Sequence, residues 1–113
     1  MEKLNHFESA ILEKLTENNP EIKKHIPYLI VKERKITDAA MRIYLSYAAG
    51  SDSLEYIKKL NLSTNGYLKM EGLTDGLIDG TKITNGRIDL MELVTYGESW
   101  DGVIRDFFWD DKL

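Results

Sequence analysis

Glycine is confined to the later part of the chain, and this distribution constrains the fold more than any other feature. None of the eight glycines precedes Gly50, and seven of them lie between Gly66 and Gly102. Glycine is unfavourable inside helices and common in tight turns. The sequence therefore predicts helix at the N-terminus, followed by a region rich in strands and turns.

The N-terminal residues follow a helical period. Asn5 and Glu8 resemble a capping box, in which each of two side chains bonds to the other residue's backbone. We expect this helix to end near residues 18–20, with Pro20 opening a second short helix that Pro27 ends. Apolar residues at spacings of three and four form the stripe that would be buried: Leu4, Phe7, Ile11 and Leu15.

From residue 28 onward, alternation of apolar and polar residues predicts strands. The expected strands are residues 28–31, 40–47, 67–70, 81–84 and 87–95. Asn85-Gly86 predicts a hairpin turn between the last two strands, because both positions tolerate the positive φ of a type I′ turn. Residues 53–60 are compatible with a short helix.

The chain of 113 residues is long enough for one domain, residues 1–113. We expect an α+β fold, with one or two N-terminal helices packed on one face of a mainly antiparallel β-sheet of about four to six strands. Leu90 and Leu93 cannot share one face of a regular strand, so either a bulge lies near residues 91–92 or one of the two is outside the core. The predicted core is Leu4, Phe7, Ile11, Leu15, Ile30, Met41, Ile43, Leu45, Leu68, Ile88, Leu90 and Leu93.

The net charge of −4 arises in the second half of the chain. Residues 1–60 carry ten Lys and Arg against nine Asp and Glu, whereas residues 61–113 carry five against ten. This acidity argues against general nucleic-acid binding, which needs clustered cations. The one basic cluster, Lys32, Arg34 and Lys35, is expected to be a solvated strand edge.

The residue types present disfavour metal and thiol chemistry. The chain has no cysteine, which excludes disulfides, thiolate nucleophiles and Cys-ligated metals. His6 and His25 are too far apart to form a metal pair on one helix face, so we expect both on the surface. The segment that begins at Asp75 does not match a calcium loop, because Leu77 and Gly86 stand where oxygen ligands are required. We expect no metal and no cofactor.

No catalytic motif is complete. The stretch around Ser99 lacks the last glycine of a nucleophile elbow, where Asp101 stands instead. The glycines are too scattered for a phosphate-binding loop. Acidic residues are so frequent in the second half that no pair of carboxylates stands out, and we expect no catalytic residues. The N-terminus has no basic region followed by an apolar run, and no segment is apolar enough to span a membrane, so we expect a cytoplasmic protein.

The C-terminal segment combines aromatic and acidic side chains. Five of the eleven aromatic residues lie in the last eighteen positions, together with five acidic residues. One interpretation is a terminal segment pinned to the sheet by its rings, with the acids in water. The other is a partner-binding face, since aromatic anchors rimmed by charge are typical of interfaces. That face would suit a cationic partner and would comprise Glu98, Trp100, Asp101, Asp106, Trp109 and Asp110.

One group of proteins shares a pattern with residues 86–100. The segment runs Gly86-Arg87, then Met91-Glu92 where the group carries Leu-Glu, then Thr95-Tyr96-Gly97 and Trp100. In this it resembles a group of small, uncharacterised bacterial cytoplasmic proteins. Further landmarks of that group have counterparts at Phe7-Glu8, at Arg34 to Thr37 and at Glu71-Gly72-Leu73. The sequence departs from the group at Ala39, Ala40 and Leu93, where glycine is usual. The resemblance implies an α+β fold and assigns no catalytic residue.

Three functions from different classes remain open. Size, acidity and the lack of a catalytic motif are similar to those of immunity proteins, which bacteria pair with secreted toxins. The first hypothesis is therefore a non-enzymatic binding protein, a monomer or homodimer, that neutralises a cationic, nuclease-type toxin. The second is a small enzyme that uses carboxylates of the acidic half, and the third is a structural or oligomerisation subunit.

Overall fold

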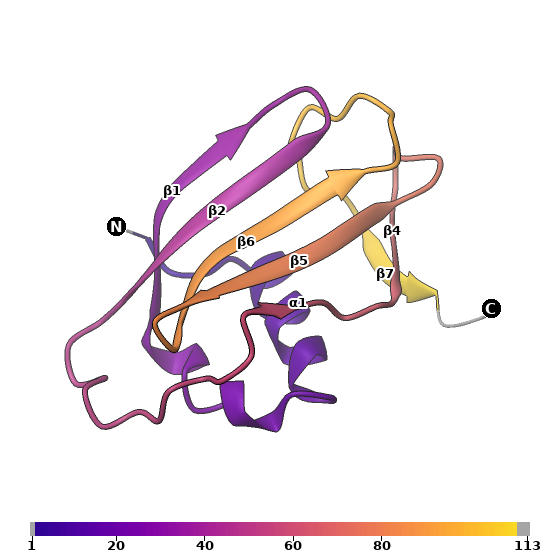
Figure 1. Cartoon of the computed structure of the whole chain (residues 1–113). Helices are drawn as coiled ribbons and strands as arrows, with labels where there is room; N and C mark the ends of the chain where they lie inside the picture. Colours follow the sequence, from indigo (N-terminus) through magenta and orange to yellow (C-terminus); the bar gives the residue numbers. More distant parts are fainter. Residues whose placement is uncertain (1, 111–113) are drawn as a thin grey trace.

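The computed structural model describes residues 2–110, and it contains a seven-stranded antiparallel β-sheet with a short N-terminal helix (Figure 1). The helical elements are α1 (His6–Thr16) and two 3₁₀ turns, η1 (Pro20–Ile22) and η2 (Ile26–Tyr28). The strands are β1 (Leu29–Ile36), β2 (Ala40–Tyr47), β3 (Asn61–Leu62), β4 (Tyr67–Met70), β5 (Leu77–Thr84), β6 (Arg87–Thr95) and β7 (Phe107–Asp110). The expected α+β class and antiparallel sheet are present, with less helix and more strands than predicted.

The start of α1 is fixed by the predicted capping box. The Asn5 side chain accepts a hydrogen bond from the Glu8 amide at 2.8 Å, and the Glu8 carboxylate accepts one from the Asn5 amide at 2.9 Å. These bonds satisfy two backbone donors that a helix otherwise leaves without partners. The expected second helix is reduced to the turns η1 and η2, each with a proline in its first positions.

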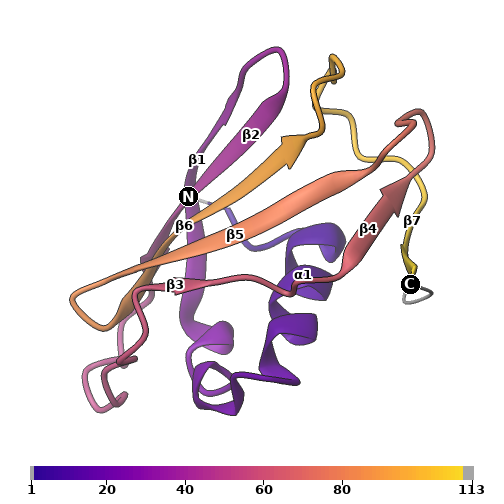
Figure 2. The same cartoon turned by 45° about the vertical axis from the view of Figure 1, so that its right-hand side comes forward.

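The sheet has the strand order β1-β2-β6-β5-β4-β7, with β3 also paired to β5. The predicted hairpin joins β5 to β6, and both turn residues have positive φ, 50° at Asn85 and 76° at Gly86. The segment that carries β3 and β4 follows the other edge of β5, and β7 adds to β4 (Figure 2). Residues 53–60 form no helix, contrary to expectation, and instead run as irregular chain between β2 and β3.

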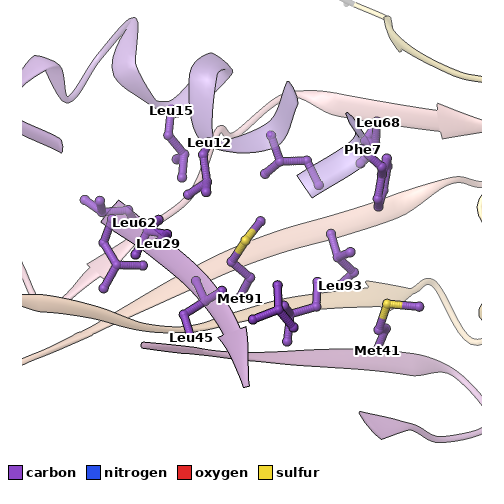
Figure 3. Close-up of a cluster of buried hydrophobic side chains, with 14 of the residues drawn as sticks. Phe7, Leu12, Leu15, Leu29, Met41, Leu45, Leu62, Leu68, Met91 and Leu93 are labelled. Atoms are coloured by element: carbon purple, nitrogen blue, oxygen red, sulfur yellow. The ribbon is translucent and has the colours of Figure 1, made fainter. Parts of the chain in front are cut away.

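The core is one cluster of buried apolar side chains contributed by α1, η1 and the strands. In Figure 3, Leu12 and Leu15 of α1 point toward strand residues that include Met91 and Leu93. Nine of the predicted core residues are buried: Phe7, Ile11, Leu15, Met41, Ile43, Leu45, Leu68, Ile88 and Leu93.

Three predicted core residues are only half-buried, namely Leu4, Ile30 and Leu90. Ile30 was placed on the wrong face, because its neighbours Leu29 and Val31 are the buried residues of β1. A bulge in β6 moves Leu90 away from the core: Lys82 pairs with Leu90 and Ile83 with Ile88, so Asp89 is an extra residue in its strand. After this bulge the inward face is taken by Met91 and Leu93.

Candidate functional site

Three chain connections meet at one end of the sheet. They are the β1–β2 turn (residues 37–39), the β4–β5 turn (71–76) and the β6–β7 loop (96–106), at the upper right of Figure 1. The Trp100 amide donates to the Asp38 carbonyl oxygen at 2.8 Å, and the Glu71 amide donates to the Asp106 carbonyl oxygen at 2.8 Å. The long loop is thereby tied to both turns.

Glu98 adds a second tie between the loop and the β4–β5 turn. Its carboxylate accepts hydrogen bonds from the backbone amides of Thr74 and Asp75, each at 2.9 Å. The bonds from Asp75 and then Thr74 lower the pKa of Glu98, because they favour its charged form. Glu98 therefore remains an anion while it holds the turn in place.

A cleft of about 660 Å³ lies between these connections. Its lining residues come from all three of them and from the end of β1, so the site exists only in the folded sheet. Both apolar and polar residues line it. The lining residues are Ile36, Thr37, Asp38, Gly72, Leu73, Ser99, Trp100, Asp101 and Arg105.

Asp101 and Arg105 form an ion pair within this cleft. Two guanidinium nitrogens approach the two carboxylate oxygens, at 2.8 Å and 3.1 Å, and the Val103 amide donates to the same carboxylate at 3.0 Å. The hydrogen bonds from Arg105 and then from Val103 hold the pKa of Asp101 at about 2. The same pairing raises the pKa of Arg105. The pair fixes the shape of the loop and neutralises the one cation in the cleft lining.

Asp38 differs from the other acids of the cleft. Within residues 2–110, its carboxylate has no ion-pair partner, since the only bond made by this residue near the cleft is that of its backbone carbonyl to Trp100. Its side chain is exposed where it lines the cleft. Asp38 is thus an uncompensated negative charge in the cleft wall.

The whole end of the molecule around the cleft is acidic. Residues 37–39, 71–76 and 96–106 contain six acids and a single cation, Arg105. We call this region the acidic end; its acids are Asp38, Glu71, Asp75, Glu98, Asp101 and Asp106. All six lie in these three connections, which are far apart in the chain and which strand pairing brings to one place.

The structure divides the predicted partner-binding residues into two groups. Glu98, Trp100, Asp101 and Asp106 all belong to the β6–β7 loop and lie at the acidic end. Trp100 is only 4% exposed, and its indole N–H donates to the Val103 carbonyl at 3.2 Å. It packs in the core beneath the cleft and presents little surface to a partner.

Trp109 and Asp110 lie on β7, opposite Leu68 and Tyr67 of β4. Because β7 runs antiparallel to β4, this pairing carries both residues away from the acidic end, as the course of β7 in Figure 2 shows. Trp109 is half-buried, and the ammonium of Lys14 lies 5.7 Å from its ring centroid. The aromatic rings of the C-terminal segment are therefore spread along a strand that is paired to the sheet.

His25 was predicted on the surface, and this prediction is wrong. Its side chain is 1% exposed and bonds to the Tyr47 hydroxyl and the Glu55 carbonyl oxygen, each at 2.8 Å. Both ring nitrogens are thus occupied. Across the described part of the chain, no group of three or more His, Asp or Glu side chains is placed to hold a metal ion.

Sequence reasoning missed the lining residues outside the C-terminal segment, namely Ile36, Thr37, Asp38, Gly72 and Leu73. Each follows or ends a strand, so turn composition alone did not separate them from other turn residues. Four of the residues quoted for the resemblance, Thr37, Gly72, Leu73 and Trp100, line this cleft, and the other residues named for it do not.

No family model, curated protein or solved structure matches the chain. No helix within residues 2–110 is long and apolar enough to cross a membrane.

Proposed function

We propose that this chain is a non-enzymatic, cytoplasmic binding protein that neutralises a cationic, nuclease-type bacterial toxin by direct contact, as an immunity protein does. The observation that carries the proposal is the acidic end, where six acids and one cation surround an open cleft. A nuclease must carry Lys and Arg to hold phosphates, and an acidic surface can cover those same cations.

The protonation state of the acids favours a role in binding over a role in acid–base catalysis. The pKa of Asp101 is held at about 2 by Arg105, and hydrogen bonds lower the pKa of Glu98. A general acid or base works best with a pKa near the working pH, so carboxylates fixed in the charged form are better suited to attract cations. Glu98 and Asp106 would provide charge, Asp101 would hold the loop through its pair with Arg105, and Trp100 would support the loop that carries them. Trp109 and Asp110 would extend the contact along β7.

The arrangement of the sheet supports the same proposal. The side chains of Phe7, Ile11 and Leu12 on α1 lie in the hydrophobic cluster with strand residues. We propose that α1 and the 3₁₀ turns close this face of the sheet and that the partner meets the exposed connections at the acidic end.

The test is capture of the native partner followed by an activity assay. The tagged protein would be used to isolate its partner from the source cells, and the captured protein would be assayed for nuclease activity with and without added immunity protein. We expect a cationic nuclease whose activity the protein suppresses. A captured partner without nuclease activity, or a nuclease that remains active in the complex, would contradict the proposal.

Two charge-matched variants locate the contact. The first neutralises three acids of the acidic end that lie outside the cleft: Glu71→Gln, Asp75→Asn and Asp106→Asn. The second neutralises three exposed acids elsewhere: Glu13→Gln, Glu21→Gln and Asp52→Asn. Each removes the same formal charge, so we expect loss of inhibition only in the first.

A further inference from the structure

The cleft at the acidic end has the chemical features of a site for one cationic side chain. Its apolar walls include Ile36, which is 53% exposed, and Leu73. The aliphatic stem of a long cationic side chain can lie against such a wall. Of the two carboxylates in the lining, Asp101 is paired with Arg105 and Asp38 has no cation beside it.

The charge balance inside the cleft selects a cation. Arg105 does not repel a positive ligand strongly, because Asp101 pairs with it in a two-point contact of 2.8 Å and 3.1 Å. The net charge of the lining is therefore that of Asp38. Glu98 precedes the lining residue Ser99 in the chain and stays ionised, which adds negative potential near the cleft.

The remaining polar side chains of the lining, Thr37 and Ser99, have hydroxyls that can accept hydrogen bonds. The Thr37 hydroxyl donates to the Ala40 carbonyl at 3.4 Å, which leaves its lone pairs available, and Ser99 is exposed. A guanidinium has five N–H donors in a planar fork that matches a carboxylate and can reach further oxygens. Lysine presents three donors on a strongly hydrated point charge and matches this arrangement less well.

We infer that the cleft receives an arginine side chain of the partner, with the guanidinium on Asp38 and the aliphatic stem between Ile36 and Leu73. This inference rests on the proposed function, because the arginine would be one of the cations by which a nuclease holds phosphate. It makes Asp38, which sequence reasoning did not single out, the main determinant of specificity at the acidic end.

The inference can be tested without the native partner. The probe is L-arginine amide, added to the isotope-labelled full chain while backbone amide shifts are followed by NMR. L-citrulline amide is the matched control, since it has nearly the same shape and lacks the guanidinium charge. We expect saturable shifts at Thr37, Asp38, Leu73 and Ser99 with arginine amide and none with citrulline amide.

Two variants assign the effect to one carboxylate. Asp38→Asn should weaken binding of arginine amide about fivefold, the size expected for one partly exposed charged contact. Asp75→Asn removes an equal charge from the same end but outside the cleft, and it should change the affinity less than twofold. The unshifted part of each spectrum reports directly whether the variant is folded.

Three outcomes would overturn the inference: equal binding of citrulline amide, equal binding of L-lysine amide, or unchanged affinity in Asp38→Asn. None of these three outcomes contradicts the proposed function, because the test of that function uses acids outside the cleft. Conversely, a captured partner without nuclease activity would remove the proposed function and leave a measured arginine site standing.

Discussion

At the scale of single residues, the carboxylate of Glu8 is the charged group that most needs a partner inside the protein. It is 0% exposed, although it lies on a helix of eleven residues near the surface of a small protein. Arg34 of β1 donates to it from two nitrogens, at 2.7 Å and 2.8 Å. This pairing raises the pKa of Arg34 above its ordinary value. The sequence predicted the capping role of Glu8 but placed Arg34 in a solvated cluster, because the contact joins residues 26 positions apart.

The Glu8–Arg34 pair leads to the first prediction. Arg34→Ala leaves a buried carboxylate without its cation, and we expect the free energy of unfolding to fall by about 3 kcal/mol. This is the low end for buried pairs, because the Arg34 side chain is itself 25% exposed. Arg42→Ala is the control, since it breaks the pair with Glu92 on the solvent-exposed surface and should cost much less. Equal losses in urea denaturation would contradict the prediction.

His25 leads to a prediction about pH. The Glu55 carbonyl can only accept, so Nε2 of His25 carries the proton and Nδ1 accepts from the Tyr47 hydroxyl, whose oxygen accepts from the Ile88 amide at 2.8 Å. Burial, with a smaller effect of Arg87, lowers the pKa of His25. The unfolded chain therefore takes up this proton near pH 6.5, before the folded chain does.

We expect the stability of the protein to fall as the pH drops below about 6.5, because proton uptake favours the unfolded state. Urea denaturation between about pH 7.5 and about pH 5 would measure this. His25→Gln should lose most of this dependence, whereas His6→Gln, at an exposed position, should retain it. The same pH profile in His25→Gln as in the unaltered protein would refute the assignment.

At the scale of elements, the sequence predicted the bounds of the strands better than which side of each strand is buried. The predicted bounds of β2, β4 and β6 match the structure, because alternation and turn residues are local signals. The assignment of Ile30 and Leu90 to the core was wrong. The bulge in β6 and the choice of the buried face of β1 both depend on the partner strand, which local alternation does not reveal. β3 and β7 were missed because two and four residues without alternation leave no periodic signal.

The β4–β5 turn, which builds one wall of the cleft, depends on Gly76. Its φ is 77°, and a Cβ atom there would collide with the backbone carbonyl of Leu68, which cannot move aside without breaking the strand. Gly97 has a φ of 92° and open space around it. Gly97→Ala should cost about 1–2 kcal/mol from backbone strain alone. Gly76→Ala should cost clearly more and should shift the amide signals of residues 71–76; similar melting temperatures would contradict this.

At the scale of the whole molecule, the candidate site could be predicted only in part. The composition of the C-terminal segment pointed to Glu98, Trp100, Asp101 and Asp106, which do lie at one end of the sheet. The cleft could not be predicted, because the β6–β7 loop crosses the ends of β5 and β4 before its strand adds to the sheet. Only this strand order brings Asp38 and Leu73 to the same loop, and no local pattern encodes it.

The acidic end and the cleft should affect different rate constants for binding of the native partner. Long-range attraction acts before contact, so neutralising Glu71, Asp75 and Asp106 should lower the association rate about tenfold at low salt and flatten its dependence on salt. Asp38→Asn acts on a short-range contact and should mainly raise the dissociation rate. Stopped-flow measurements from about 0.02 M to about 0.3 M salt separate the two effects. The control variant at Glu13, Glu21 and Asp52 has the same net charge as the first, so an equal fall in its association rate would mean that overall charge, and not the acidic end, attracts the partner.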